Sequence, residues 1–600
     1  MAEQGSQVVR MAEAVTLDGL FRERVKRTPD TVAYRAWNEP HKNWRDYTWA
    51  QINRQVARWQ SALEKDGLKA GERVAVMLRN SPEWVTFDQA ALGLGAVVVP
   101  LYTQDRAENV AYIIDNAGCK VLLIEGREQW KELAEVKGQL GGLVRIVSVD
   151  AIPEAGDPRV KSLAEWLPEE GGETRHLARD PGTLATIVYT SGTTGRPKGV
   201  MLSHTNILSN VEGSCAVLTP RSDDLLLSFL PLSHTFERTC GYYLAVMTGA
   251  TTAYSRGIPV LGEDLQSVRP TLLISVPRIY ERVWGRIRDA LNAGSPLKKK
   301  LFHAAVEVGY ARFEHAQGRG PWKPSFLLWP ILNALVAKKI LARLGGRVRA
   351  AISGGAALPA EISRVFIGLG LTVLQGYGMT ELSPVSIANR PDDNLPASVG
   401  SALPGVQVKI GENNALMVKG PNVMLGYWGN PEATKSVLGA DGWLNTGDTA
   451  RIDEKGHVFI TGRLKEIIVL SNGEKLPPGD IEGAIARDPL FEQVMLLGEG
   501  KPYLSVLTVL NADHWMKLCT EKGLDAAPTA VNAKAACDAL CARIGAQMKA
   551  FPGYAQVRRV HATLEPWSVE NGLLTPTLKL KRAKVMERFH AEVDRMYEGH

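Results

Sequence analysis

Tyr189-Thr-Ser-Gly-Thr-Thr-Gly-Arg-Pro-Lys-Gly199 is the stretch around which the rest of this chain is organised. The apolar, β-branched run 184–189 predicts a buried strand that ends in a tight turn. In that turn, hydroxyl side chains alternate with glycines that let backbone amides approach an anion, and Lys198 adds a mobile positive charge. These features predict a loop that holds nucleotide phosphates, with a Gly/Thr-rich hairpin turn as the plain alternative.

The loop is not of the Walker A type, because Lys198 follows Arg-Pro and no Ser or Thr comes after it. The complete string resembles the phosphate loop of the adenylate-forming acyl-ligase superfamily, which includes acyl-CoA synthetases, luciferase-like enzymes and peptide-synthetase adenylation domains. The resemblance implies four further motifs in a fixed order. It also implies contacts to ATP from the loop, made by Thr190, Ser191, Gly192, Thr193, Thr194, Gly195 and Lys198.

Length and composition indicate a soluble globular chain of several lobes. The 600 residues are too many for one core, and 45% hydrophobic and 22% charged residues are ordinary proportions. A net charge of +6 suits polyanionic substrates or an anionic membrane surface but does not indicate nucleic-acid binding. The six cysteines have no framework spacing, which favours a reduced, cytoplasmic setting. Cys537 and Cys541 share a helical face but lack His partners for a metal.

The N-terminal part alternates predicted helices and strands, which indicates an α/β sheet covered on both faces. Helices are expected at 49–63, 81–94 and 107–117, and strands at 73–78, 96–101 and 120–124. The resemblance implies a large N-terminal AMP-binding domain at 1–464, built of α/β subdomains with a distorted β-barrel. A small mobile α+β domain is expected at 465–600.

A basic, partly apolar insertion is expected at about 282–346, where a long acyl chain or a membrane would lie. Its most apolar segment, 326–337, is about a dozen residues long and is interrupted by Pro330 and Asn333, so it is expected to be too short to span a bilayer. A core helix is the first interpretation. An interfacial helix on anionic lipid is the alternative, because Lys338, Lys339 and Arg343 follow closely.

Several residues of the N-terminal part are assigned to the site. His234 follows the predicted strand 225–230, where α/β sheets place ligands, although a structural histidine is the alternative. Asp448, on a tight turn, can accept both ribose hydroxyls, unless it only forms an Asx turn. By resemblance, His234 lies by the carboxylate and α-phosphate, Tyr377 faces adenine, Thr380 binds phosphate and Glu381 binds Mg²⁺. The resemblance adds nucleotide or acyl contacts from Gly354, Gly355, Ala356, Gln375, Gly376, Gly378 and Arg463.

The C-terminal part carries the remaining assignments. By resemblance, Lys465 is the hinge between domains, Gly473 lines a thiol tunnel and Lys579 is the catalytic lysine. Many family members have a glycine before that lysine, whereas this chain has Leu578. The form Leu-Thr-Pro-Thr-x-Lys-x-Lys-Arg at 574–582 resembles that of long-chain acyl-CoA synthetases.

The resemblance therefore implies ATP-dependent activation of a fatty acid, most plausibly long-chain, to acyl-AMP, followed by transfer to CoA. ATP, Mg²⁺ and CoA are the expected cofactors and co-substrates. A medium-chain or aromatic acid, a carrier-protein acceptor, and a non-catalytic lipid- or nucleotide-binding scaffold are the alternatives. The expected enzyme is cytoplasmic, with peripheral membrane contact as a variant, and the sequence leaves both monomer and homodimer open.

Overall fold

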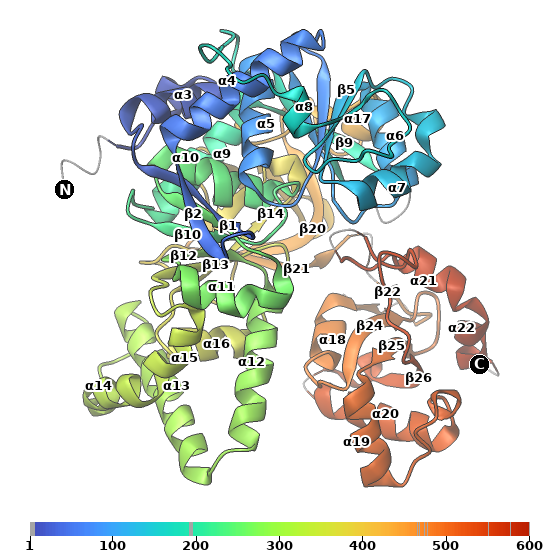
Figure 1. The fold of residues 1–600 in the computed structure, drawn as a ribbon. Helices are drawn as coiled ribbons and strands as arrows, with labels where there is room; N and C mark the ends of the chain where they lie inside the picture. The colour runs from blue at the N-terminus through green and yellow to red at the C-terminus, as the bar shows by residue number, and fades with distance from the viewer. Residues whose placement is uncertain are drawn as a thin grey trace.

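The computed structural model describes residues 7–190, 196–464, 466, 468–472, 474–476, 478–549, 551–575 and 578–598. A large N-terminal lobe lies at the top of Figure 1, with a helical projection below it on the left and a separate C-terminal domain on the right. Ser191, Gly192, Thr193, Thr194 and Gly195 of the predicted phosphate loop, and the C-terminal residues Lys465 and Gly473, lie outside the described residues.

The first sheet of the N-terminal lobe has eight strands in the order β19-β9-β8-β4-β3-β5-β6-β7. Its strands from β8 to β7 run parallel, whereas β9 and β19 add an antiparallel edge. The strand bounds are β3 Arg73–Met77, β4 Val97–Pro100, β5 Cys119–Ile124, β6 Arg145–Ser148, β7 Val160–Ser162, β8 Leu184–Thr190, β9 Lys198–Ser203 and β19 Gly426–Tyr427.

The second sheet has nine strands in the order β16-β15-β14-β13-β12-β10-β11-β1-β2, again parallel at its centre and antiparallel at both edges. Its bounds are β1 Val32–Asn38, β2 Asn43–Thr48, β10 Leu225–Ser228, β11 Thr251–Tyr254, β12 Leu272–Ser275, β13 Ala350–Ser353, β14 Val373–Gly378, β15 Val385–Ala388 and β16 Ser401–Ala402.

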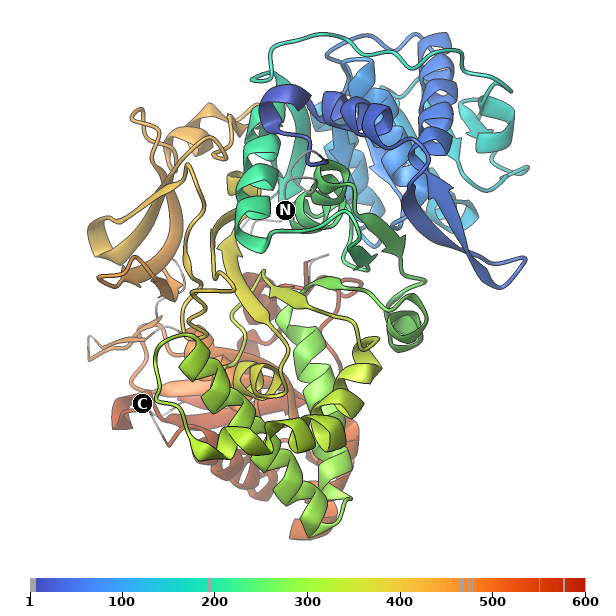
Figure 2. The same ribbon diagram turned by 90° about the vertical axis from the view of Figure 1, so that its left-hand side faces the viewer.

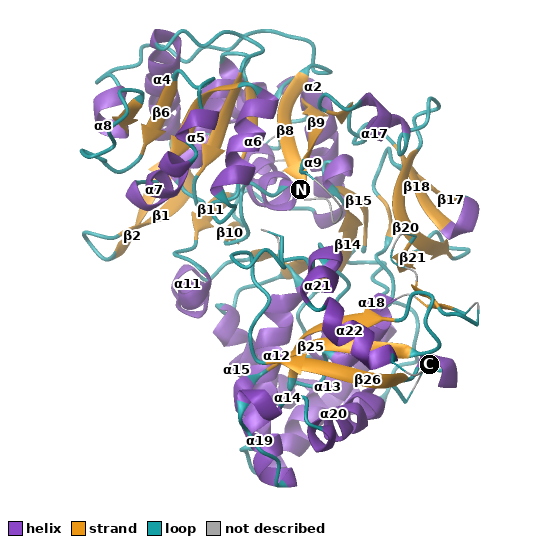
Figure 3. Ribbon diagram, turned by 90° about the vertical axis from the view of Figure 1, so that its right-hand side faces the viewer, coloured by secondary structure: helices purple, strands orange, loops and turns teal. Residues whose placement is uncertain are grey.

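Helices lie between the two sheets and on their outer faces, as the alternating pattern predicted (Figure 3). The shared inner layer contains α3 Leu17–Arg27, α4 Trp49–Lys65, α5 Pro82–Gly93, α9 His204–Leu218 and α10 Leu244–Thr248. α6 Ala107–Ala117 and α7 Arg127–Glu135 cover the first sheet, and α11 Leu261–Val268 and α16 Ala360–Gly368 cover the second. Local signals start these helices: Ser81 accepts from the amide of Trp84, and Pro82 occupies the first turn of α5.

Where the resemblance implied a distorted β-barrel, the chain forms a four-stranded antiparallel sheet in the order β17-β18-β20-β21. The bounds are β17 Gln407–Ile410, β18 Ala415–Lys419, β20 Leu444–Ile452 and β21 Val458–Arg463. The sheet is visible on the left of Figure 2, close to where the chain enters the C-terminal domain. It therefore brings the end of β21 to the boundary between the two lobes.

The insertion is helical, as expected, but its apolar segment is longer and more exposed than the sequence suggested. α12 Pro277–Asn292 and α13 Pro296–Ala316 precede a continuous helical run over Pro324–Leu344. Pro330 does not break this run because it lies in the first turn of α14 Trp329–Leu332. At Asn333 the chain widens into π-helical turns, η5 Asn333–Ala337, instead of ending.

Two expectations for this segment are therefore wrong. The run is 21 residues long, enough by length and composition to cross a membrane, rather than about a dozen. Only 17% of its most apolar window is buried, so it is not a core helix. The run continues through α15 Lys338–Leu341 and η6 Ala342–Leu344, and it begins with η4 Pro324–Leu328.

The C-terminal domain has its own hydrophobic cores around the three-stranded sheet β24-β25-β26. Its strands are β22 Ile468–Val469, β23 Lys475–Leu476, β24 Phe491–Leu497, β25 Leu504–Leu510 and β26 Val557–Thr563. Its helices are α18 Pro478–Ile485, α19 Ala512–Lys522, α20 Lys534–Gln547, α21 Arg582–Arg588 and α22 His590–Tyr597. Strands and helices are thus mixed as expected for a small α+β domain.

Candidate active site

The predicted phosphate loop joins two antiparallel strands of the first sheet. Thr190, the last residue of β8, pairs with Lys198, the first residue of β9, and its hydroxyl lies 3.5 Å from the Lys198 carbonyl oxygen. The Gly199 backbone is tightly enclosed, since a Cβ there would come within 2.7 Å of the Ile187 side chain. The flanks of the loop are therefore rigidly held, and the exposed Lys198 side chain is free to reach a ligand.

Glu381 and Lys198 are linked through Tyr427, which the sequence analysis did not assign. The Tyr427 hydroxyl donates to Glu381 Oε1 at 2.8 Å, and the Lys198 ammonium lies 5.2 Å from the centre of the same ring. Glu381 is buried in a short 3₁₀ turn, with Thr380 beside it. Burial, and then the Glu381 carboxylate, raise the pKa of the Tyr427 hydroxyl, so it stays protonated and continues to donate. One oxygen of Glu381 remains available for a cation.

Asp448 lies within β20 of the four-stranded sheet, where Tyr377 and Arg463 both contact its carboxylate. The Tyr377 hydroxyl donates to Oδ2 at 2.5 Å, and Arg463 Nε lies 3.1 Å from Oδ1. Asp448 and Arg463 face each other directly across β20 and β21. The backbone amide of Asp448 donates to the Thr446 hydroxyl at 3.2 Å, which fixes the turn. Each carboxylate oxygen keeps a second lone pair for a hydroxyl donor such as that of a ribose.

His234 lies in the turn after β10. The side chain of Asn80, in the loop between β3 and α5, binds the backbone of this turn. Asn80 donates to the Leu230 carbonyl at 2.7 Å and accepts from the amide of Leu232 at 2.9 Å. His234 Nδ1 accepts from the amide of Phe236 at 3.1 Å, so the neutral ring carries its hydrogen on Nε2. Burial, and then the charge of Lys579, lower the pKa of His234 to about 4. His234 is therefore a neutral hydrogen-bond donor at neutral pH.

Residues of the protein itself constrain the glycine turn after β13. Gly354 donates its amide to the Ser275 carbonyl, and a Cβ there would come within 2.9 Å of the Phe236 ring. Gly355 has φ +81°, a conformation that favours glycine, and it is exposed together with Ala356. These two residues leave the open surface that a flat base requires.

The last four residues of β14, in the second sheet, are Gln375, Gly376, Tyr377 and Gly378. Gln375 is occupied structurally: its amide group accepts from Leu358 N at 3.0 Å and donates to the Pro396 carbonyl at 2.6 Å. A Cβ on Gly378 would overlap the Pro384 carbonyl oxygen, at 1.8 Å. Gln375 and Gly378 thus shape the turn before Glu381 whether or not they contact a ligand.

Lys579 reaches this site from the C-terminal domain. It lies on a small hairpin in which the amide of Lys579 donates to the Thr575 hydroxyl at 3.0 Å and Leu574 bridges to Leu580. Burial, and then Arg463, lower the pKa of Lys579, while Asp448 and Glu381 of the large lobe oppose that shift. Lys579 as a whole residue is exposed. The domain is therefore turned so that Lys579 faces the predicted ATP site.

The residue before this lysine has a backbone conformation that favours glycine. Leu578 has φ +60°, in the left-handed region that disfavours side chains with a Cβ. Leu578 is 46% exposed, so its side chain gains little from packing in this orientation. The chain adopts this conformation with leucine at position 578, directly before Lys579.

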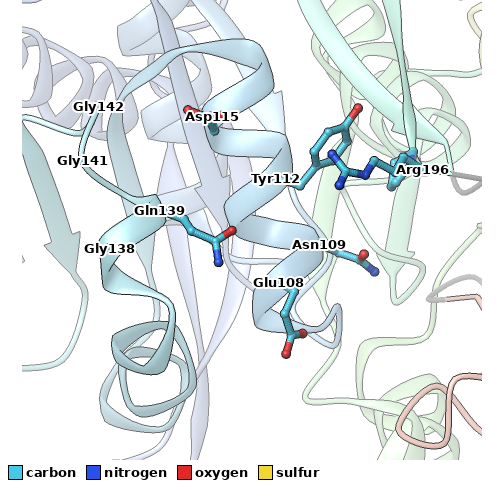
Figure 4. A pocket seen from close by; sticks show the side chains of 10 residues that line it. Glu108, Asn109, Tyr112, Asp115, Gly138, Gln139, Gly141, Gly142 and Arg196 are labelled. Atoms are coloured by element: carbon cyan, nitrogen blue, oxygen red, sulfur yellow. The ribbon is translucent and has the colours of Figure 1, made fainter.

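A groove of about 520 Å³ adjoins the phosphate loop (Figure 4). It is lined by one face of α6, by residues 138–142 and by Arg196-Pro197. The Arg196 guanidinium lies over the Tyr112 ring, 5.0 Å from its centre. Among the described residues, none of those predicted for ATP or Mg²⁺ lines this groove, and neither Glu381 nor Asp448 is part of its lining.

Comparisons with known proteins identify relatives along the whole chain. The AMP-binding enzyme family matches residues 21–428, and the family of AMP-binding enzyme C-terminal domains matches residues 465–600. Long-chain-fatty-acid–CoA ligase FadD15 of Mycobacterium bovis is 32% identical over 587 residues, covering 96% of each chain. Long-chain-fatty-acid–[acyl-carrier-protein] ligase AEE15 of Arabidopsis thaliana is 28% identical over 658 residues, covering 99% of this chain and 88% of that protein.

Among solved structures, anthranilate CoA ligase AuaEII in complex with anthranoyl-AMP is similar with a TM-score of 0.73 and 19% identity. The alignment covers 97% of this chain and 98% of that chain. At this level of identity the comparison establishes a shared fold. That fold includes both the large lobe and the C-terminal domain.

Proposed function

Because this chain belongs to the AMP-binding enzyme family, we propose that it is an acid–thiol ligase that converts a long-chain fatty acid to its CoA thioester. In the first half-reaction the carboxylate of the acid attacks the α-phosphate of ATP, which gives acyl-AMP and releases pyrophosphate. In the second, the thiol of CoA attacks the acyl carbon, and AMP leaves. The fatty acid as substrate rests on the near-full-length similarity to a long-chain-fatty-acid–CoA ligase.

The observation that carries the proposal is the convergence of Lys579 with Glu381 and Asp448. These groups come from two domains and more than one sheet, yet their charges act on one another strongly enough to influence the pKa of Lys579. A carboxylate that approaches ATP meets like charge, so this reaction requires cations at the phosphates before bond formation. Lys579 of the C-terminal domain and Lys198 of β9 supply such cations.

The remaining side chains position the reactants. His234 offers a neutral Nε2–H, which can bind an oxygen of the acid or of the α-phosphate without competing for a proton. Asp448 accepts from the ribose hydroxyls while Tyr377 and Arg463 fix its orientation. Thr380 and the amides of the loop 190–198 contact the phosphates. Catalysis then depends chiefly on positioning and charge stabilisation.

Glu381 fits a Mg²⁺ ion, which prefers hard oxygen ligands. Tyr427 orients the carboxylate through one oxygen and leaves the other free. Within the described residues no three His, Cys, Asp or Glu side chains form a metal cluster, so phosphate oxygens and water would complete the coordination. When bound, the ion would neutralise phosphate charge.

The second half-reaction requires no nucleophile from the protein, because acyl-AMP already carries a good leaving group. The thiol needs an open path, whereas Lys579 fills the site in the present orientation. We therefore propose that the C-terminal domain, 465–600, rotates about Lys465 between the half-reactions and brings Gly473 to the thiol path. The boundary at 464/465 is supported by the separate hydrophobic cores and by the family match that begins at residue 465.

The first test is ATP–pyrophosphate exchange with acids from acetate to oleate, plus benzoate, with and without CoA. We expect the highest exchange with long-chain acids and CoA-dependent release of AMP. A maximum at short or aromatic acids would retain the mechanism and contradict the long-chain substrate. Failure of every acid to support exchange would favour a non-catalytic nucleotide-binding scaffold.

The role of Lys579 has its own test. In Lys579→Ala, we expect adenylation to fall by at least about 1,000-fold, because a positioned cation is lost from the phosphates. Thioester formation from supplied acyl-AMP should stay within about fivefold of wild type, since Lys579 is not needed for thiol attack. Equal loss of both half-reactions would contradict this division.

A carrier protein is the second candidate acceptor, supported by the similarity to the acyl-carrier-protein ligase of Arabidopsis thaliana. Transfer of the acyl group to the phosphopantetheine of a carrier protein, with no turnover of free CoA, would establish this alternative. For either acceptor we propose a cytoplasmic enzyme, in keeping with the free cysteines. A long-chain acid partitions into bilayers, so peripheral membrane contact would bring the enzyme to its substrate.

A further inference from the structure

The outer face of the helical run 324–344 exposes a group of large apolar side chains. Leu327 is 73% exposed, Ile331 60%, Leu328 53% and Leu335 48%. Their spacing of three and four residues places them along one side of a helix. Trp322, 54% exposed, lies just before the run. We call these five residues the apolar face.

The opposite side of the same run anchors it to the protein. Ala337 packs with Phe302, Val306 and residues of α16 in a hydrophobic cluster, and Phe326, Leu332 and Leu344 are also buried. Trp329 lies beneath the Arg312 guanidinium, 4.9 Å away. The run is therefore fixed on α13 and α16 by one side while the apolar face stays outside. Crossing a bilayer would strip these buried contacts, so the run is suited to lie on a surface.

The stretch of sequence that carries the apolar face is basic. Between Glu314 and Glu361 the sequence contains no Asp or Glu. Lys338, Lys339 and Arg343 continue the exposed side of the run, and in the described part of the chain they form no ion pair. Arg319 and Arg349, by contrast, are paired with Glu314 and Asp224. The unpaired cations, together with Lys323 and Arg347, form what we call the basic flank.

We propose that the apolar face and the basic flank together dock on an anionic lipid bilayer. Apolar side chains would enter the boundary between headgroups and acyl chains, while the Lys and Arg side chains meet the negative lipid headgroups. A second copy of this chain fits less well, because it would bring two basic flanks together. Figure 1 shows α14 at the outer tip of the projection, clear of the C-terminal domain, so docking leaves that domain unobstructed.

This inference deepens the proposed function, since it brings the enzyme to the phase in which a long-chain acid is dissolved. Docking nevertheless depends only on the apolar face and the basic flank. It is therefore measured in the absence of ATP, acid and CoA. Loss of ligase activity with vesicle binding intact would contradict the proposed function alone.

The experiment is flotation of the full chain with vesicles of phosphatidylcholine and with vesicles containing phosphatidylglycerol. We expect recovery with the anionic vesicles, weaker recovery with the neutral ones, and release by salt. The variant Leu327→Ser/Ile331→Ser/Leu335→Ser should lose binding to both. The variant Lys338→Gln/Lys339→Gln/Arg343→Gln should bind anionic vesicles at least about tenfold more weakly and neutral vesicles unchanged.

Met516→Ser is the matched control, because Met516 is 54% exposed on α19 of the C-terminal domain. It should float like wild type. Retained ATP–pyrophosphate exchange with a water-soluble acid would show that each variant is folded. The inference would be overturned if the wild-type protein bound neither kind of vesicle. It would also be overturned if the variant with serines in the apolar face floated with vesicles as well as the wild type does. Light scattering that shows a wild-type dimer dissociated by the serine variant would likewise overturn it, because the face would then bind a second copy.

Discussion

One tyrosine joins two of the groups that we propose act at the phosphates of ATP, Glu381 and Lys198. Tyr427 holds Glu381 with its hydroxyl and lies against Lys198 with its ring. The edge strand β19 fixes it, since Tyr427 pairs with Val200 of β9. A carboxylate that accepts a hydrogen bond from a fixed donor is restricted in orientation, which is what a metal ligand requires.

Tyr427→Phe should keep the ring and remove only the donor to Glu381. A hydrogen bond to a charged group contributes about 1.5–3 kcal/mol, so we expect adenylation to fall roughly 10- to 100-fold. The Mg²⁺ concentration for half-maximal exchange should rise, because Glu381 is no longer oriented. Tyr554→Phe, at an exposed tyrosine of the C-terminal domain, is the control. An unchanged Mg²⁺ titration would contradict the positioning role.

Glu237 makes stability depend on pH. Burial raises the pKa of Glu237 to about 8, and nearby Ser228 moderates that rise without forming a hydrogen bond of standard geometry. The folded protein thus keeps a proton that the unfolded chain loses above its ordinary pKa of 4.5. The resulting stability is present below pH 4.5 and is lost as pH rises through 8, by at most about 1.4 kcal/mol per unit.

Glu237→Gln imitates the protonated side chain and should remove this dependence. Between about pH 5 and pH 9, the thermal midpoint of the wild-type N-terminal lobe should fall relative to that of the variant. Differential scanning calorimetry across this range is the measurement. Glu39→Gln, at an exposed glutamate, should run parallel to wild type. If the difference in thermal midpoint between wild type and Glu237→Gln stayed constant over this pH range, the pKa of Glu237 would be the same in the folded and unfolded protein.

At the scale of elements, a π-helix links the His234 turn to both sheets. It spans η2 Glu237–Tyr243, and its Arg238 pairs with Asp88 of α5 and donates to the Thr186 hydroxyl of β8 at 2.7 Å. Arg238 and Asp88 are almost completely buried. Tyr243 also donates to Asp88, at 2.7 Å. The strand that enters the phosphate loop and the turn that carries His234 thus share one buried ion pair.

Removing only one partner of the Arg238–Asp88 ion pair should strongly destabilise the protein. Arg238→Met leaves the Asp88 carboxylate buried without its counter-charge, and we expect a loss of about 3–5 kcal/mol of stability in the N-terminal lobe. The double variant Asp88→Leu/Arg238→Met should recover most of it. Arg364→Met removes an exposed ion pair with Glu307 and should cost no more than about 1 kcal/mol. Equal losses in the single and double variants, measured by thermal unfolding, would rule out the charge explanation.

Sequence patterns predicted elements well where local signals agree. The strand before the phosphate loop, the helix 107–117 and the alternation that builds the first sheet follow from periodicity, caps and glycines. The helical run 324–344 was underestimated because Pro330 and Asn333 are local breakers whose effect depends on their exact place in a turn. Contacts such as Tyr427 with Glu381 join residues far apart in sequence, and no local pattern encodes them. The roles of Ser191 to Gly195, Lys465 and Gly473 rest on family resemblance.

For the whole molecule, the decisive variable is the orientation of the C-terminal domain. Lys579 faces the large lobe, and Lys581 of the same segment lies close enough to Asp105 and Arg106 for their charges to act on one another. Burial, and then Arg106, lower the pKa of Lys581, whereas Asp105 opposes that shift. Asp105 thus offsets the repulsion between Lys581 of the C-terminal domain and Arg106 of the large lobe. We therefore expect the charge of Asp105 to favour the present orientation, in which we propose that Lys579 acts on ATP.

Asp105→Asn removes that charge and keeps an oxygen that can accept from the Arg106 amide and the Asn109 side chain. With Lys581 and Arg106 no longer balanced, we expect adenylation to fall up to about fivefold, the equivalent of about 1 kcal/mol in the domain equilibrium. Thioester formation from supplied acyl-AMP needs the other orientation, so it should stay equal or rise. Asp115→Asn, an exposed change on α6, the helix that follows Asp105, should leave both half-reactions unchanged. If Asp105→Asn slowed both half-reactions equally, its charge would support the fold of the lobe rather than select one orientation of the C-terminal domain.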